Sequence, residues 1–296
     1  KGFSRVSWDD ALNLIGDRLR DTPPERQGWF ASSKGITNES YYTFTKAARA
    51  MGTNNVDLCA RLCHAATVAG LKRTIGVGAP TCSLKDMVGT DLLLLIGTNI
   101  ANNQPVTMKY LVEAKKRGTR VVVINTTLER GLERYWVPSM PVSAVFGTRL
   151  MDDFVQVNAG GDIAFMSGML KHVLALGAED NDFIAEHTTG FDELKAKLHS
   201  LTWEELEQIS GTSRREMEWV GELFARAKSA VTVYSMGLTQ HRFGTENVES
   251  VVNLHLSRGM IGRDYCGILP IRGHSGVQGG GECGPHAAAR LWWRCA

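Results

Sequence analysis

A thiol, an imidazole and a guanidinium are the side chains of this sequence with the clearest chemical potential. Cys63 and His64 are adjacent, and Arg272 stands in the glycine-rich segment 270–279, about 200 residues later. A cysteine thiolate is a soft metal ligand, and a histidine beside it can exchange a proton near neutral pH. An arginine fork can bind a carboxylate through two hydrogen bonds. Together these residue types favour a metal centre that acts on a small anion.

Each of these residues also has a purely structural interpretation. A free cysteine is often a small buried hydrophobe, a lone histidine is often packed or solvated, and an arginine can simply form a salt bridge. Cys59 precedes Cys63 by four positions, but no second Cys/His pair stands at a spacing typical of structural zinc. We therefore expect no zinc site and interpret Cys59 as a core residue.

The composition is that of an ordinary globular protein. The chain has 296 residues, of which 43% are hydrophobic and 22% charged, so one large or two interleaved domains are expected. A net charge of +2 gives no reason to expect nucleic acid or an acidic membrane as a partner. The longest apolar run, 92–96, is too short to span a bilayer. Six scattered cysteines and the lack of a signal peptide predict thiols in the cytoplasm, although Lys1 leaves an upstream segment open.

Alternating strand and helix patterns predict an α/β fold. Segment 91–96 is typical of a buried strand, a helix is expected from 105 to 117, and 120–125 is the next strand. This βαβ pattern implies a parallel sheet with a right-handed crossover. Further strands are expected at 28–31, 154–157 and 230–234, helices from Ser7, from Asn38, within 180–228 and over 245–260, and a loop over 267–284.

The loops that follow the predicted strands carry small and polar side chains. Ligands of open α/β sheets collect at the carboxyl ends of the strands, and helix N-termini there favour phosphate groups. Asp162 follows two glycines and could accept both N–H groups of a guanine edge, or could cap the next helix. The candidate cofactor-binding residues are Ser33, Lys34, Asn38, Gly97, Asn99, Asn125, Thr126, Arg130, Gly161, Asp162, Gly237, Thr239, Gln240 and Gly273.

Four segments carry a resemblance to a known family. Segments 6–12 and 32–39, the stretch 53–71 around Cys63 and the loop 270–279 occur in the family's order, and the likeness extends from about residue 3 to residue 284. The chain resembles the molybdenum/tungsten bis-pterin oxidoreductases, in particular the formate dehydrogenase alpha-subunit group. The resemblance implies that Cys63 binds the metal.

The resemblance also assigns roles to three other residues. It implies that His64 is a proton carrier, that Arg272 faces the substrate, and that His274 is a further catalytic residue. The chain departs from the formate dehydrogenases at His274, where glutamine is usual, and at Lys34, where arginine is more familiar. A related small substrate therefore stays open beside formate.

The resemblance further implies a domain plan, a cofactor and partners. A parallel-sheet dinucleotide-binding-like domain over 57–270 is interleaved with a second α/β domain made of 1–56 and a return segment 271–296, whose tail is atypical from 285. The implied cofactor is bis-molybdopterin guanine dinucleotide with molybdenum or tungsten. The implied reaction is two-electron oxidation of formate to CO2 or of a related small anionic substrate. Electrons would pass to an acceptor protein or subunit, through an iron–sulfur cluster outside this chain.

Two alternatives remain open at this point. A nicotinamide-dependent dehydrogenase would suit a parallel dinucleotide-binding fold, but no G-x-G-x-x-G opens a helix, and 76–80 contains only two glycines. A non-catalytic fragment that holds a pterin nucleotide is the other alternative, because no iron–sulfur cysteine cluster precedes Cys63.

Overall fold

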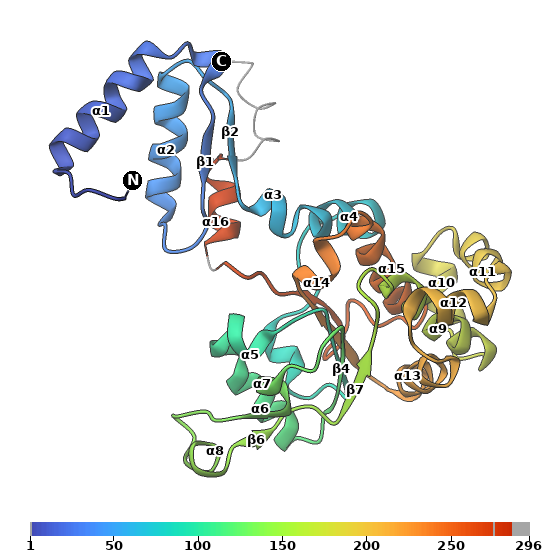
Figure 1. Cartoon of the computed structure of the whole chain (residues 1–296). Coiled ribbons are helices and arrows are strands. Elements are labelled where there is room, and N and C mark those ends of the chain that lie inside the picture. The colour runs from blue at the N-terminus through green and yellow to red at the C-terminus, as the bar shows by residue number, and fades with distance from the viewer. Residues whose placement is uncertain (1, 275, 286–296) are drawn as a thin grey trace. The chain divides into compact units, whose positions relative to one another are not determined.

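The chain folds into two compact units (Figure 1). The structure, a computed structural model, describes residues 2–274 and 276–285. Residues 63–273 form one unit, here called the sheet unit, and residues 1–62 with 274–296 form the other, here called the split unit. The family domains 1–56, 57–270 and 271–296 stay a prediction, and the atypical tail from residue 286 lies outside the described residues.

The described part of the sheet unit contains one five-stranded sheet, and all of its strands are parallel. Leu92 pairs with Arg120 and Ile96 with Ile124, so the predicted βαβ unit and the α/β fold class are confirmed. In spatial order the strands are β7 (Asp153–Gln156), β4 (Arg120–Asn125), β3 (Leu92–Ile96), β8 (Ala230–Tyr234) and β9 (Gly267–Pro270).

Strand β3 is apolar throughout because both of its faces are covered. Leu92, Leu94 and Ile96 belong to one hydrophobic cluster, whereas Leu93 and Leu95 belong to another. Successive side chains of a strand point to opposite faces, so a strand buried on both faces has no polar position. The run of four leucines and an isoleucine therefore predicts a central strand.

Helices cover both faces of the sheet. The first cluster contains side chains of α4 (Ala65–Ile75), α9 (Asp162–Ala175), α13 (Arg214–Arg226) and α15 (Gly244–Leu256). The second contains side chains of α5 (Ile100–Asn103), α6 (Met108–Lys116) and α7 (Arg130–Glu133). Among the described residues, no helix is both long enough and apolar enough to cross a membrane.

The remaining elements of the sheet unit are short. The predicted capping boxes begin α12 (Trp203–Ser210) and α13, where Thr202 pairs with Glu205 and Ser213 with Glu216. The short elements are η2 (Leu84–Met87), η3 (Pro105–Thr107), β5 (Arg134–Tyr135), α8 (Pro141–Phe146), β6 (Thr148–Arg149), α10 (Asn181–His187), α11 (Phe191–Ser200), α12 and α14 (Met236–Thr239).

The split unit joins its first segment to the return segment. Its small core contains Ala31, Tyr41, Leu58 and Ala60, and Val277 from the return segment completes it. Strands β1 and β2 pair in parallel. The elements are α1 (Trp8–Asp21), η1 (Pro24–Arg26), β1 (Trp29–Ala31), α2 (Asn38–Ala50), β2 (Val56–Leu58) and α16 (Val277–Glu282), while α3 (Ala60–Cys63) crosses the unit boundary.

Helix α1 forms where the sequence predicts it, but it buries none of its residues. Ser7 caps the helix by accepting the backbone N–H of Asp10 at 3.1 Å. Its predicted apolar face is exposed at Trp8, Leu12 and Ile15. The amphipathic pattern therefore predicts the helix without identifying what covers it.

The prediction of a single loop over 267–284 is wrong. Strand β9 opens this segment and pairs with β8 from Val231↔Gly267 to Tyr234↔Pro270, and helix α16 closes it. Glycine and proline are strong turn signals, so the sequence pattern did not indicate a strand of only four residues. Because β9 is the last strand of the sheet, Pro270 needs no backbone donor toward a further strand.

Buried His255 makes the stability of the sheet unit depend on pH. Its Nε2 lies 2.7 Å from Thr232 Oγ1 and its Nδ1 lies 3.1 Å from the carbonyl oxygen of Met260. Burial lowers its pKa to about 4. Between an unfolded pKa near 6.5 and about 4, the unfolded chain binds a proton that the folded chain does not, so stability falls as the pH falls.

We expect the free energy of unfolding to drop by about 2 kcal/mol between pH 7 and pH 5 through His255 alone. Urea unfolding at the two pH values, compared with a His255→Gln variant, isolates this contribution. An equal drop in the variant would show that other groups cause it.

Candidate active site

The predicted binding residues of the sheet unit gather at one edge of the sheet. Because the strands are parallel, their carboxyl ends meet at the same edge. The chain proceeds from β3 to β4 and β7 on one side and then to β8 and β9 on the other, so the strand order reverses between β3 and β8. At this edge stand Gly161 and Asp162 after β7; Asn125, Thr126 and Arg130 at or after the end of β4; Gly97 and Asn99 after β3; Gly237, Thr239 and Gln240 after β8; and Arg272 and Gly273 after β9.

Gly97 and Gly237 touch across the point where the strand order reverses. The N–H of Gly237 donates to the carbonyl oxygen of Gly97 at 3.0 Å. A Cβ atom added to Gly237 would lie 2.5 Å from both the Cα and the oxygen of Gly97, and Gly97 has a φ of +55°. Only glycine fits this approach at both positions.

Cys63 lies at the end of α3, directly before His64 and helix α4. Cys63 is only 6% exposed, so its thiol is largely shielded from water. Its carbonyl oxygen accepts the hydroxyl of Thr239 at 2.6 Å. This bond ties the cysteine backbone to the segment that follows β8, and it engages a hydroxyl that the sequence assigns to cofactor binding.

His64 is fully buried and hydrogen-bonded through both ring nitrogens. Nδ1 lies 2.8 Å from Thr67 Oγ1, which also accepts the hydroxyl of Tyr234 at 3.1 Å. Nε2 lies 3.2 Å from the carbonyl oxygen of Ile271. Since a carbonyl only accepts, Nε2 carries the proton and Nδ1 accepts from Thr67. Burial, and then the charge of Arg272, lower the pKa of His64 to about 4.

Thr67 is the centre of this hydrogen-bond chain, and replacing it by valine should destabilise the fold. The variant leaves the Nδ1 of His64 and the hydroxyl of Tyr234 buried without their partner, which costs about 2–3 kcal/mol. Tyr234→Phe removes one donor and leaves the Thr67–His64 bond intact, so about 1 kcal/mol is expected. Chemical denaturation measures both. Equal losses would contradict a central role for Thr67.

Arg272 directly follows Ile271, whose carbonyl oxygen accepts Nε2 of His64. The guanidinium of Arg272 also interacts electrostatically with Cys63. The backbone carbonyl of Arg272 accepts Nε2 of Gln104 at 2.9 Å. Burial lowers the pKa of its guanidinium, while interaction with Cys63 and Tyr234 works in the opposite direction. The structure therefore brings together the thiol, the imidazole and the guanidinium that the sequence singles out.

Two buried polar atoms near this edge have no hydrogen-bond partner among the described residues: Thr98 Oγ1 and Gln104 Oε1. Thr98 directly follows Gly97, and Gln104 holds the backbone of Arg272. Buried polar atoms without partners are costly, so a ligand that meets them is favourable. A bulky anionic metal cofactor would suit this set of groups. The set consists of a largely buried soft thiol, a nearby cation, a pair of glycines and these two polar atoms.

The other predicted residues of this edge have local roles. Asn99 caps α5 through the N–H of Asn102 at 3.3 Å, and the Asn125 side chain accepts the N–H of Thr126 at 2.9 Å. Asp162 is the first residue of α9, whose N-cap is Gly161, so the predicted capping role of Asp162 is wrong. Burial raises the pKa of Asp162, and the charge of His241 opposes that shift.

A second group of predicted residues lies in the split unit. Cys59 connects two of them, with its Sγ 2.8 Å from Ser33 Oγ and 3.1 Å from His274 Nδ1. Ser33 is buried, and its carbonyl oxygen accepts the N–H of Gly276 at 3.0 Å. Lys34 is exposed.

Asn38 of the split unit meets the return segment. It begins helix α2, and its side-chain oxygen occupies the place that a Cβ on Gly279 would take. Any side chain at position 279 would therefore displace Asn38.

Sequence reasoning missed Thr67, Tyr234, Gln104 and the contacts of Cys59. Thr67 stands three residues after His64, a spacing that puts two side chains on one helical face. Cys59 is half-buried and hydrogen-bonded to two predicted site residues, so its interpretation as a core residue is incomplete. The partners Tyr234 and Gln104 are distant in sequence and give no local signal.

Known proteins are similar to this chain in sequence and in fold. The family model for molybdopterin oxidoreductases matches residues 1–287. Protein YdeP of Escherichia coli is 37% identical over 289 residues, covering 94% of this chain and 38% of that protein. Formate dehydrogenase H of Escherichia coli is 33% identical over 284 residues, covering 94% of this chain and 38% of the enzyme.

A solved structure agrees at the level of the fold. Acetylene hydratase from Pelobacter acetylenicus has a TM-score of 0.67 at 21% identity, over 90% of this chain and 34% of that one. This chain thus spans less than two fifths of the length of the two curated relatives. The match over nearly the whole chain establishes that it belongs to the molybdopterin oxidoreductase family.

Proposed function

We propose that the protein is a molybdenum- or tungsten-dependent oxidoreductase that oxidises formate, or a related small anion, by two electrons. The observation that carries this proposal is the neighbourhood of Cys63, His64 and Arg272 at the carboxyl edge of the parallel sheet. The likeness to formate dehydrogenase H supports formate, whereas the greater identity to protein YdeP leaves a related substrate open.

In this proposal Cys63 supplies a thiolate ligand, which suits molybdenum or tungsten. A molybdopterin cofactor, when bound, accepts two electrons. Arg272 binds the substrate carboxylate through its guanidinium fork, and Gln104 fixes the backbone from which the arginine extends. His64 exchanges a proton at Nδ1 through the hydroxyl of Thr67, because that hydroxyl already faces Nδ1.

The finer form of the cofactor is also a proposal. We assign bis-molybdopterin guanine dinucleotide to the glycine-lined edge, with the carboxylate of Asp162 accepting the N–H groups of a guanine. The half-buried position of Asp162 supports this assignment, because burial raises the pKa of its carboxyl and a double donor would stabilise the carboxylate. An iron–sulfur cluster and an electron-acceptor protein or subunit would lie outside this chain, and a cytoplasmic location stays a prediction.

Metal analysis, pterin extraction and a formate oxidation assay with an artificial electron acceptor test the proposal on the cofactor-loaded protein. We expect molybdenum or tungsten, a guanine-bearing pterin and formate-dependent reduction of the acceptor. Metal and pterin without formate oxidation would favour a different small anion and direct attention to His274. A preparation that takes up neither metal nor pterin would contradict the proposal.

Arg272→Lys tests the substrate role within this function. Lysine keeps the positive charge but loses the planar fork, so we expect kcat/KM for formate to fall at least about tenfold. Metal and pterin contents should stay as in the unchanged protein, because the backbone bond from Gln104 does not depend on the side chain. Unchanged formate turnover would show that this arginine is structural.

A second candidate function is cofactor binding without turnover by this chain alone. It is supported by the lengths of the curated relatives, because the matched region makes up only 38% of each of them. Two results together would favour this candidate. This chain alone should take up pterin nucleotide but not oxidise formate, and formate oxidation should appear when the remaining parts of an active enzyme are added.

A further inference from the structure

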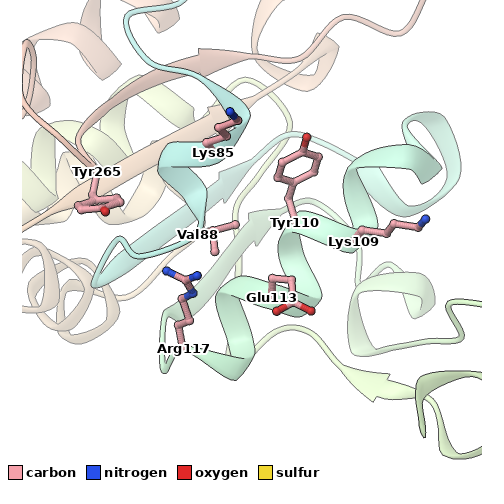
Figure 2. A pocket seen from close by; sticks show the side chains of 7 residues that line it. All are labelled: Lys85, Val88, Lys109, Tyr110, Glu113, Arg117 and Tyr265. Carbon is pink, nitrogen blue, oxygen red and sulfur yellow. The ribbon is translucent and has the colours of Figure 1, made fainter. Parts of the chain in front are cut away.

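A cavity of about 530 Å³ lies in the sheet unit, away from the edge that holds Cys63. Lys85 and Val88 precede β3, Arg117 precedes β4 and Tyr265 precedes β9, so one wall stands at the amino ends of the strands. Tyr110 and Lys109 of helix α6 complete the lining (Figure 2). The cavity is therefore built from other loops than the candidate active site.

The charge of this cavity is positive. Within residues 2–274 and 276–285, neither Lys85, Lys109 nor Arg117 forms an ion pair. The one carboxylate of the lining, Glu113, is paired with Lys116 at 2.8 Å. Three cationic residues thus line a cavity whose only acidic lining residue already has a partner, and an anionic ligand would complement them.

The walls of the cavity are aromatic. The ring of Tyr110 rises from α6, the ring of Tyr265 comes from the segment before β9, and Val88 lies between them in the view of Figure 2. Tyr110 and Val88 are half-buried, whereas Tyr265 is 43% exposed. Aromatic rings that keep open faces can stack on a planar ligand.

The backbone at Tyr265 is held in an unfavourable conformation. Its φ is +61°, and no other non-glycine residue of the described chain has a positive φ. Its ring packs against Gly89, where an added Cβ would lie 2.9 Å from a ring carbon. A bulky residue at positive φ costs free energy, and such strain is concentrated where a side chain must be presented. The conformation places the ring in the cavity wall independently of the charges.

We propose that this cavity binds a planar aromatic or heteroaromatic molecule that carries a phosphate or carboxylate and is about the size of a mononucleotide. The volume lies in the usual range for small-molecule sites. The two tyrosine rings would contact the planar part of the ligand, and the guanidinium of Arg117 its anionic group. The proposal does not depend on the reaction proposed above, because none of these residues belongs to the candidate active site.

Calorimetric titration of the full chain with adenosine monophosphate tests a heteroaromatic phosphate, and 4-hydroxyphenylacetate tests an aromatic carboxylate. Two partial probes serve for comparison: adenosine has the planar ring without the phosphate, and ribose 5-phosphate has the phosphate without the ring. We expect adenosine monophosphate or 4-hydroxyphenylacetate to bind at least tenfold more tightly than adenosine and than ribose 5-phosphate. Equal binding of the partial probes, no binding of any probe, or equal binding of an oligoglutamate peptide would overturn the proposal.

Two variants and one control locate the site. Arg117→Gln and Tyr265→Leu should each weaken binding of the better probe at least tenfold. Arg215→Gln is the matched control, because Arg215 is an exposed arginine on α13, a helix of the opposite face of the sheet. A loss equal to that of Arg117→Gln would show unspecific attraction by positive charge. Circular dichroism of each variant must match the unchanged chain, and loss of binding by Arg117→Gln alone suffices if Tyr265→Leu misfolds.

Discussion

Replacing Cys63 by alanine should abolish turnover of the cofactor-loaded protein, with a loss of at least about a thousandfold in kcat. Cys63 is largely buried and interacts electrostatically with the guanidinium of Arg272, a setting that suits a thiolate bound to a metal. Most of the pterin should remain bound, since the residues proposed to hold it stand after the five strands of the sheet. Activity assays, metal analysis and the X-ray absorption edge of the metal measure the three effects.

Cys82→Ala is the matched control for this variant. Cys82 is a half-buried cysteine of the sheet unit, and burial raises the pKa of its thiol to about 12, so it stays protonated and cannot act as a ready ligand. We expect unchanged metal content and turnover in Cys82→Ala. If Cys63→Ala kept both its activity and the metal spectrum of the unchanged protein, the proposed ligand role would have to be abandoned.

Gly237→Ala should destabilise the sheet unit by about 3 kcal/mol or more, because its methyl group would press on the backbone of Gly97. No flexible side chain can move aside here, since the nearest atoms are a Cα and a carbonyl oxygen. The two loops must separate, and their 3.0 Å hydrogen bond would be lost. Guanidinium unfolding measures the change, and cofactor uptake should fall with it.

Gly177→Ala separates this clash from the general cost of changing a glycine. A Cβ on Gly177 would meet open space, and only its φ of +61° opposes alanine, so about 1 kcal/mol is expected. Similar losses in the two variants would show that the contact between Gly97 and Gly237 has no special importance.

Much of the sheet was predictable because burial leaves a direct trace in sequence. Strand β3 is a continuous apolar run, and β8 is interrupted only by Thr232. The segment between β3 and β4 is long enough for a helix and has a glycine near its end. Strand β9 was missed because its four residues include Gly267 and Pro270. Its place in the sheet depends on pairing with β8, a tertiary contact that no local pattern records.

The candidate site divides in the same way. Cys63, His64 and Arg272 could be selected from their chemistry and a family resemblance, and parallel strands explain why distant loops share an edge. The chain from Tyr234 through Thr67 to His64 could not be selected, because its hydrogen bond joins residues 167 positions apart. Residue types in a sequence indicate possible ligands, but not which buried donors orient them.

The order of synthesis imposes a delay on the split unit. Residues 1–62 leave the ribosome before the sheet unit, yet Val277 of the return segment belongs to their core, and Gly280 packs against the ring of Tyr41. The first segment must therefore wait until the whole sheet unit has been translated, while segments made first usually fold first. During that interval the partly formed core around Tyr41 stays open, and the nascent chain should be most sensitive to chaperone depletion and proteolysis before residue 277 emerges.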